Sequence, residues 1–157
     1  MSHNETYETP VSMLHCFKEI DTTAAMTIHI EISDFSRFSV AKKFSSYVGL
    51  TLGESSSGDK TTYLSITKQG NSTVRRILIE CVQALVKGSP GVKSKDIKQR
   101  QKGQNAAVIE CADRAVERLQ RKYHKMMYQG ISRNKAITAI ARELACFVWG
   151  METGNIY

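Results

Sequence analysis

A run of serine and glycine, GESSSGDK at residues 53–60, carries hydroxyl groups and a lysine that could do chemistry. Such residues can cradle a phosphate, attack an ester, or form a solvated turn. The spacing of Gly53 and Gly58 fits a nucleotide phosphate loop, but Asp59 pushes Lys60 out of register and puts a carboxylate where a phosphate would lie. The TTYLSI segment that follows is extended in character, so no helix N-terminus would face the anion. We therefore do not expect nucleotide hydrolysis.

A serine-esterase elbow, G-x-S-x-G, does not fit either. Gly53 is followed by Glu54 and by Ser55, Ser56 and Ser57, with no closing glycine at the required position. A solvated linker stays open on composition alone, since serine and glycine are ordinary turn residues.

The cations beside this loop favour an anion site. Arg75 and Arg76 open a predicted helix, where the helix dipole makes cations unfavourable by a few tenths to about 1 kcal/mol. Lys60 and Lys68 lie on the same loop. Together with the serine hydroxyls these side chains could bind a phosphodiester backbone. The alternative is that both arginines only extend along the surface into water.

The net charge of +7 is unevenly distributed along the chain. Residues 1–58 hold four Lys/Arg and seven Asp/Glu, a charge of −3, whereas residues 59–157 hold eighteen and eight, a charge of +10. A basic half favours a polyanionic partner, most often nucleic acid, although charge alone also serves solubility. A basic segment adds five candidate contacts, which are Lys93, Lys95, Lys98, Arg100 and Lys102.

Hydrophobic spacing predicts a mainly α, small helical domain with a short extended or β element around 61–66. Helices are expected over 13–38 in two pieces broken near 21–23, over 39–49 with Ser39 as N-cap, and over 72–87, 106–130 and 132–150, with a basic loop or frayed helix over 92–105. Residues 1–12 suggest a disordered arm, and 153–157 a tail.

The four cysteines and the N-terminus point to a cytoplasmic protein without a metal site. Cys16, Cys81, Cys111 and Cys146 show no paired spacing, so buried thiols are expected rather than disulfides or zinc ligands. No apolar run reaches the roughly 20 residues of a membrane span, and the N-terminus lacks the pattern of a secretory signal.

The segment 35–85, FSRFSVAKKFSSYVGLTLGESSSGDKTTYLSITKQGNSTVRRILIECVQAL, resembles the C-terminal domain of insertion-sequence-110 family transposases, the 110/116/902 group related to the Piv invertases. The matching positions are Phe38, Ala41, Tyr47, Val48, Gly49, Leu50, Ser57, Gly58, Lys60, Ile66, Thr67, Lys68, Gly70, Asn71, Arg75, Arg76, Leu78 and Glu80. The likeness extends over about 13–152, including the NKAITAIARELACFVWGM ending.

The resemblance implies DNA transposition or recombination. Proteins of this family move DNA, and some use a structured guide RNA. Their N-terminal domain supplies carboxylates that bind Mg²⁺, and their C-terminal domain supplies a serine that attacks a phosphodiester. That serine precedes the loop glycine, which makes it Ser57 here, with Ser56 as the fallback. Asn71 falls in the ITKxGN motif and joins the lysines and arginines as a nucleic-acid contact.

The sequence departs from the family in two respects. The family's helix-hairpin-helix, expected at about 13–35, is degenerate because IDTTAAM lacks both of its glycines. No carboxylate domain is present, so we expect no cofactor in this chain and Mg²⁺ only with a carboxylate-domain partner. The resemblance thus suggests a truncated or split transposase that does not cut DNA alone. Self-association through the last helices is a further expectation.

Two other interpretations stay open: a non-catalytic nucleic-acid-binding remnant or regulator, and a helical scaffold whose charge only keeps it soluble.

Overall fold

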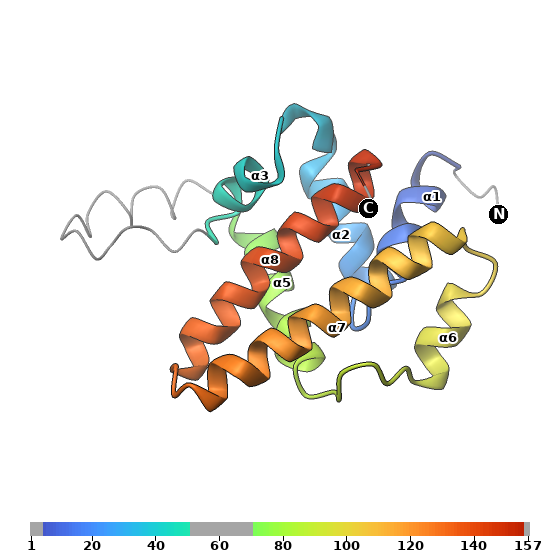
Figure 1. Ribbon diagram of the computed structural model, residues 1–157. Coiled ribbons are helices and arrows are strands. Elements are labelled where there is room, and N and C mark those ends of the chain that lie inside the picture. Colours follow the sequence, from blue (N-terminus) through green and yellow to red (C-terminus); the bar gives the residue numbers. More distant parts are fainter. Residues whose placement is uncertain (1–4, 51–70, 156–157) are drawn as a thin grey trace.

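The computed structural model describes residues 5–50 and 71–155, with side chains from residue 10 onward. Its described part is built from the helices α1 Glu5–Leu14, α2 Thr22–Ile32, α3 Ala41–Tyr47, α5 Ser72–Leu85, α6 Lys95–Gln101, α7 Ala106–Tyr128 and α8 Arg133–Thr153, with a 3-10 turn, η1, at Phe35–Arg37 (Figure 1). The predicted mainly helical fold is confirmed. The extended element predicted at 61–66 lies outside the described residues.

Helix α8 is the centre of the packing. It contacts α7, α3, α5, α1 and η1, and α7 runs beside it as the other arm of a helical hairpin (Figure 1). Small side chains allow this close packing on several sides, and four alanines of α8 are buried there: Ala136, Ala139, Ala141 and Ala145. Between the helices lie the largest fully buried side chains, among them Phe17, Phe44, Leu78, Leu119 and Leu144.

The hairpin follows its sequence pattern closely. One face of α7 is buried at Val108, Ala112, Ala115 and Leu119, which recur at helical spacing. The helix ends before Gly130, which has a φ of +80°, a conformation that glycine adopts without strain. The predictions for α7 and α8 are therefore confirmed to within a few residues.

Polar caps set most helix starts. Asp21 accepts a hydrogen bond from the Ala24 amide at 2.8 Å and begins α2, as expected near 21–23. The predicted cap of α3 was wrong, because Val40 rather than Ser39 holds the N-cap position and makes no side-chain cap bond. Val40 is extended, so the helix starts later.

The structure differs from the expected disordered arm over 1–12, because α1 starts at Glu5. Val11 and Leu14 pack into the core, and burial of these apolar side chains stabilises the end of α1. The chain then turns, with Phe17 and Ile20 still buried, before α2 begins.

Residues 92–105 contain a short helix where a basic loop or frayed helix was expected. The Ser94 hydroxyl accepts a hydrogen bond from the Ile97 amide at 3.3 Å, which caps α6. Ile97 is buried and anchors the helix, and Gly103, with a φ of +84°, follows its end.

The cysteines have the predicted state: Cys16, Cys81 and Cys111 are free and buried, and Cys146 is half-buried. Burial raises the pKa of the Cys16 thiol to about 11 and that of Cys81 to about 12, so both stay protonated and unreactive. Among the described helices, none combines the length and apolar character needed to cross a membrane.

Candidate nucleic-acid interface

The predicted nucleophile and two predicted contacts fall on 51–70, so Ser56, Ser57, Lys60 and Lys68 lie outside the described residues. The structure does describe the flanks of that segment. The Asn71 amide donates a hydrogen bond to the Tyr47 carbonyl at 3.2 Å, which joins the start of α5 to the end of α3. The described residues Tyr47 and Asn71, which lie on either side of that segment, are therefore held close together.

Asn71 is committed to contacts within the protein. Its side-chain oxygen accepts a hydrogen bond from the Val74 amide at 3.0 Å and so caps α5. Its side-chain nitrogen donates to Glu31 Oε2 at 3.1 Å, which ties α5 to α2. A nucleic-acid contact by the Asn71 side chain stays a prediction, and it would compete with these two bonds.

The two arginines of α5 differ in exposure. Arg75 is half-buried, and Arg76 is exposed with its guanidinium 3.9 Å from Glu80 Oε1. Arg76 also lines a shallow hollow together with Glu19 and Asp21. Its positive charge therefore sits among carboxylates, which weakens its attraction for a phosphate.

Two cations of the segment 93–102 face the protein. Lys93 Nζ lies 2.8 Å from Asp113 Oδ2 on α7. The Arg100 side chain is 12% exposed, donates from its NH1 nitrogen to the Ile20 carbonyl at 3.0 Å, and lies 3.4 Å from Asp96 Oδ2. Both side chains therefore hold α6 against the rest of the fold.

The buried amide of Gln101 reinforces this attachment. Its side-chain nitrogen donates to the Cys16 carbonyl at 3.0 Å and to Asp113 Oδ1 at 2.8 Å. Because Gln101 is almost fully buried, losing these partners would be costly.

The other three cations of the segment 93–102 face solvent. Lys95 and Lys98 lie in α6, three residues apart and so on one face, and Lys102 follows its last residue; all three are exposed. Within the described ranges none of the three has an ion-pair partner. These three residues, which we call the lysine face of α6, are exposed and without an ion pair, so among the described predicted contacts they are the best placed to meet phosphates.

A second basic region was missed by the sequence predictions. We call residues 121–135, the end of α7, the turn and the start of α8, the hairpin tip; it holds five Lys/Arg and no Asp/Glu. Lys125, Arg133 and Lys135 are exposed there. The absence of any acidic residue over fifteen positions was a signal that the sequence already contained.

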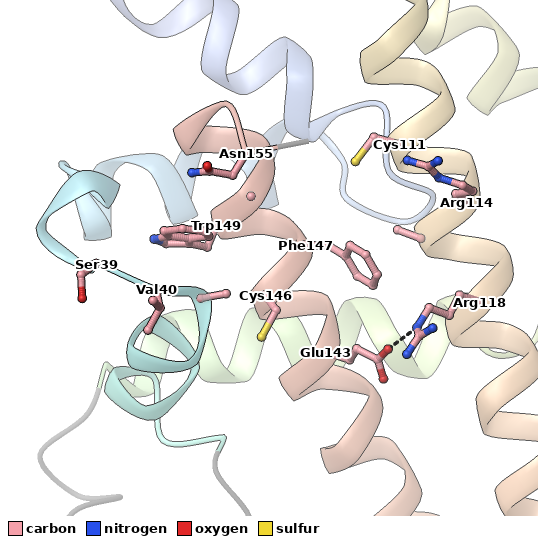
Figure 2. Close-up of a pocket in the computed structure, with 13 residues that line it drawn as sticks. Ser39, Val40, Cys111, Arg114, Arg118, Glu143, Cys146, Phe147, Trp149 and Asn155 are labelled. Atoms are coloured by element: carbon pink, nitrogen blue, oxygen red, sulfur yellow. Dashed lines mark hydrogen bonds and ion pairs between the residues drawn. The ribbon is translucent and has the colours of Figure 1, made fainter. Parts of the chain in front are cut away.

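A groove of about 900 Å³ lies between α7, α8 and the start of α3. Its lining is mostly apolar, and Figure 2 shows Phe147 and Trp149 of α8 along it, with Ser39 and Val40 near its α3 side. Trp149 Nε1 donates to the Phe38 carbonyl at 3.0 Å. None of the predicted nucleic-acid contacts that the structure describes lines this groove.

Glu143 joins the two arms of the hairpin beside the groove (Figure 2). It pairs with Arg118 at 2.5 Å and with Lys122 at 2.6 Å. Burial raises the pKa of Glu143, but the hydrogen bonds from Lys122 and Arg118 outweigh burial and leave the pKa below its ordinary value. Glu143 is therefore ionised at neutral pH.

Across the part of the chain described here, no three His, Cys, Asp or Glu side chains form a group that could hold a metal ion.

Comparison with known proteins gives one consistent family. The family model described as "Transposase IS116/IS110/IS902 family" matches residues 12–96. The putative transposase y4qE of Sinorhizobium fredii is 34% identical over 90% of this chain and 36% of its own length. The transposase for insertion sequence element IS1533 of Leptospira borgpetersenii is 30% identical over 80% of this chain and 36% of its own length.

A third relative is the transposase for insertion sequence element IS1111A of Coxiella burnetii, 30% identical over 57% of this chain and 26% of its own length. The chain spans about a third of the length of the curated relatives it matches. No solved structure matches it. Since the family model covers more than half of the chain, including the serine-glycine segment, this protein belongs to the IS116/IS110/IS902 family of transposases.

Proposed function

We propose that this chain is the C-terminal, DNA-binding part of an insertion-sequence transposase and that Ser57 attacks a phosphodiester bond during DNA transposition. The family match over residues 12–96 carries this proposal, because it spans Ser57 and the predicted contacts around it. A serine hydroxyl can serve as the nucleophile of a covalent step when a base or a metal ion activates it.

The lysine face of α6 is the proposed duplex-binding surface. Lys95, Lys98 and Lys102 share one exposed face, whereas Lys93 and Arg100 hold the fold. Exposed lysines on one helix face can follow a phosphate backbone without reading its sequence. Lys60, Lys68, Asn71, Arg75 and Arg76 remain predicted contacts around Ser57.

The described residues do not fit a Mg²⁺ site, because no group of three possible metal ligands is found among them. We assign no step of the reaction to a metal held by these residues. We also propose that another chain or domain supplies the carboxylates. A guide RNA and a second copy of this chain are further proposed partners, and a relation to the Piv invertases is part of the proposal.

Duplex affinity tests the lysine face. Fluorescence anisotropy with a labelled 20-base-pair DNA would compare the parent chain with the triple variant Lys95→Gln/Lys98→Gln/Lys102→Gln at several salt concentrations. We expect weaker binding and a slope of log K against log salt that is shallower by up to about 2.7, at about 0.9 per lost phosphate contact.

The matched control removes three other exposed cations, Lys87→Gln/Arg114→Gln/Arg121→Gln, two of which are paired with glutamates. This control has the same net charge as the triple variant. If it weakened duplex binding as much, net charge and not the lysine face would explain the affinity.

Ser57→Ala separates catalysis from binding. We expect unchanged duplex affinity and loss of strand cleavage in a reaction supplemented with a carboxylate-supplying chain of the same family. The second candidate function, a non-catalytic DNA-binding regulator, predicts no cleavage by parent or variant in that reaction. Cleavage of supercoiled DNA by this chain alone with Mg²⁺, abolished by Ser57→Ala, would overturn the need for a partner.

A further inference from the structure

The hairpin tip keeps cations that do not serve the fold. Arg121 pairs with Glu117 at 2.7 Å and Lys122 with Glu143 at 2.6 Å, so these two are engaged. For Lys125, Arg133 and Lys135 there is no ion-pair partner in the described ranges, and all three are exposed.

The position of two of these cations is unfavourable for the helix itself. Arg133 and Lys135 lie in the first turn of α8, which contains no acidic residue. The helix dipole disfavours cations at that end, so helix stability does not account for them.

Tyr128 is the most exposed large apolar side chain of the described protein, at 93%. The other described aromatic rings outside His side chains are buried or half-buried. Tyr128 follows Lys125 by three residues and His124 by four, so the three side chains share one face of α7. Proteins that bind single-stranded nucleic acids combine an exposed aromatic ring, which stacks on a base, with cations that contact the neighbouring phosphates.

We propose that the hairpin tip binds single-stranded DNA, with Tyr128 stacked on an unpaired base and Lys125, Arg133 and Lys135 against the neighbouring phosphates. A duplex covers the faces of its bases by stacking, so the ring favours a single strand. An acidic peptide would bind the cations but would not need the aromatic ring of Tyr128. A lipid surface would need more apolar area than one tyrosine offers. The choice of DNA over RNA rests on the function proposed above. The proposal that this surface binds a single strand does not depend on that function.

This surface is separate from the lysine face of α6. Figure 1 shows α6 beside the first turns of α7 and the hairpin turn at its other end. A helix of 23 residues is about 34 Å long, so one nucleotide cannot touch both surfaces.

Binding of the full chain to fluorescein-labelled oligothymidylate, 20 nucleotides long, tests the tip by anisotropy. For Tyr128→Ala we expect affinity to fall at least about fivefold, the lower end of what one stacked base contributes, whereas Tyr128→Phe keeps it. An abasic oligonucleotide of the same length should bind parent and Tyr128→Ala equally. For Lys125→Gln/Arg133→Gln/Lys135→Gln the salt slope should become shallower by about 2.

Tyr128→Trp supplies a second readout that does not depend on affinity. The parent chain already contains Trp149, so its fluorescence is the background. Oligothymidylate should quench the fluorescence that the substitution adds to this background, and a blunt 20-base-pair duplex should not. Circular dichroism of each variant confirms that the helices are kept.

Equal losses on single strand and duplex after Tyr128→Ala would overturn the stacking proposal. Tighter binding of the matching oligoribonucleotide would overturn the assignment to DNA. The proposal of a single-strand site would also be overturned if polyglutamate or anionic vesicles bound as tightly as oligothymidylate and Tyr128→Ala did not change that binding. Failure of the α6 lysine variant to change duplex binding would refute the proposed duplex surface and leave this one standing.

Discussion

The two basic segments of this protein, residues 93–102 and the hairpin tip at 121–135, hold five Lys/Arg each and use them differently. In the first segment, Arg100 reaches a backbone carbonyl of a distant turn, and Lys93 pairs with a half-exposed aspartate of α7. In the hairpin tip, Arg121 forms an exposed pair with Glu117 and Lys122 pairs with the partly buried Glu143, while Lys125, Arg133 and Lys135 have no ion-pair partner within the described ranges. Equal charge in a sequence therefore does not mean equal function, because burial decides what a cation stabilises.

Arg100→Ala should have the largest effect on stability. The side chain is 12% exposed, and its loss would leave the Ile20 carbonyl without its charged donor. We expect the free energy of unfolding to fall by about 2–3 kcal/mol, measured by urea denaturation. Lys98→Ala on the same helix is the control and should change it by less than about 0.5 kcal/mol. Similar losses in both would show that α6 is not held by its inward face.

Asp113→Ala should come next. Asp113 accepts from Lys93 at 2.8 Å and from the buried Gln101 side chain at 2.8 Å. The Lys93 pair is half-exposed, so most of the expected loss of about 1–2 kcal/mol comes from the Gln101 donor. Glu117→Ala removes the matching partner of Arg121 in the hairpin, and a loss as large there would contradict the contrast between the two segments.

Glu143→Gln should cost about 1 kcal/mol at pH 7 and show a pH dependence that identifies the cause. Hydrogen bonds from Lys122 and Arg118 hold the folded-state pKa of Glu143 below its ordinary value of 4.5. The ionised form therefore contributes stability above pH 4.5, and that contribution is lost as the pH falls below 4.5. Urea titrations from pH 7 to pH 3 should show the gap between parent and variant closing. If the difference in the free energy of unfolding persisted at pH 3, its cause would be side-chain packing rather than the charge of Glu143.

Arg121→Ala should have the smallest effect, within about 0.5 kcal/mol. Its pair with Glu117 is exposed and lies one turn away on the same helix, an arrangement that contributes little to stability. Thermal unfolding followed by circular dichroism would measure it. A loss above about 1 kcal/mol would make the hairpin tip as structural as α6.

Much of the fold could be predicted because its helices follow local rules. The apolar stripes of α5, α7 and α8, the glycine after α7 and the cap at Asp21 all appear as spacing in the sequence. Two local expectations failed for physical reasons. Residues 5–14 form a helix because Val11 and Leu14 find a core, and α3 starts after an extended Val40.

The candidate surfaces were only half predictable. The basic composition of 93–102 was visible, but the inward turn of Lys93 and Arg100 was not, because their partners are 20 and 80 positions away. The hairpin tip could have been found from its lack of acidic residues. Its importance depends on the exposed ring of Tyr128, and nothing in the sequence singled this aromatic residue out as exposed.

The sequence by itself determined the helices, their buried faces, the positive charge and the likeness to a transposase family. The tertiary structure decided which cations face water. Contacts of the segment 93–102 with α7 and with the turn before α2 turn Lys93 and Arg100 inward and leave Lys95, Lys98 and Lys102 outside. Charge is a property of each residue type, whereas exposure depends on contacts between segments far apart in the chain.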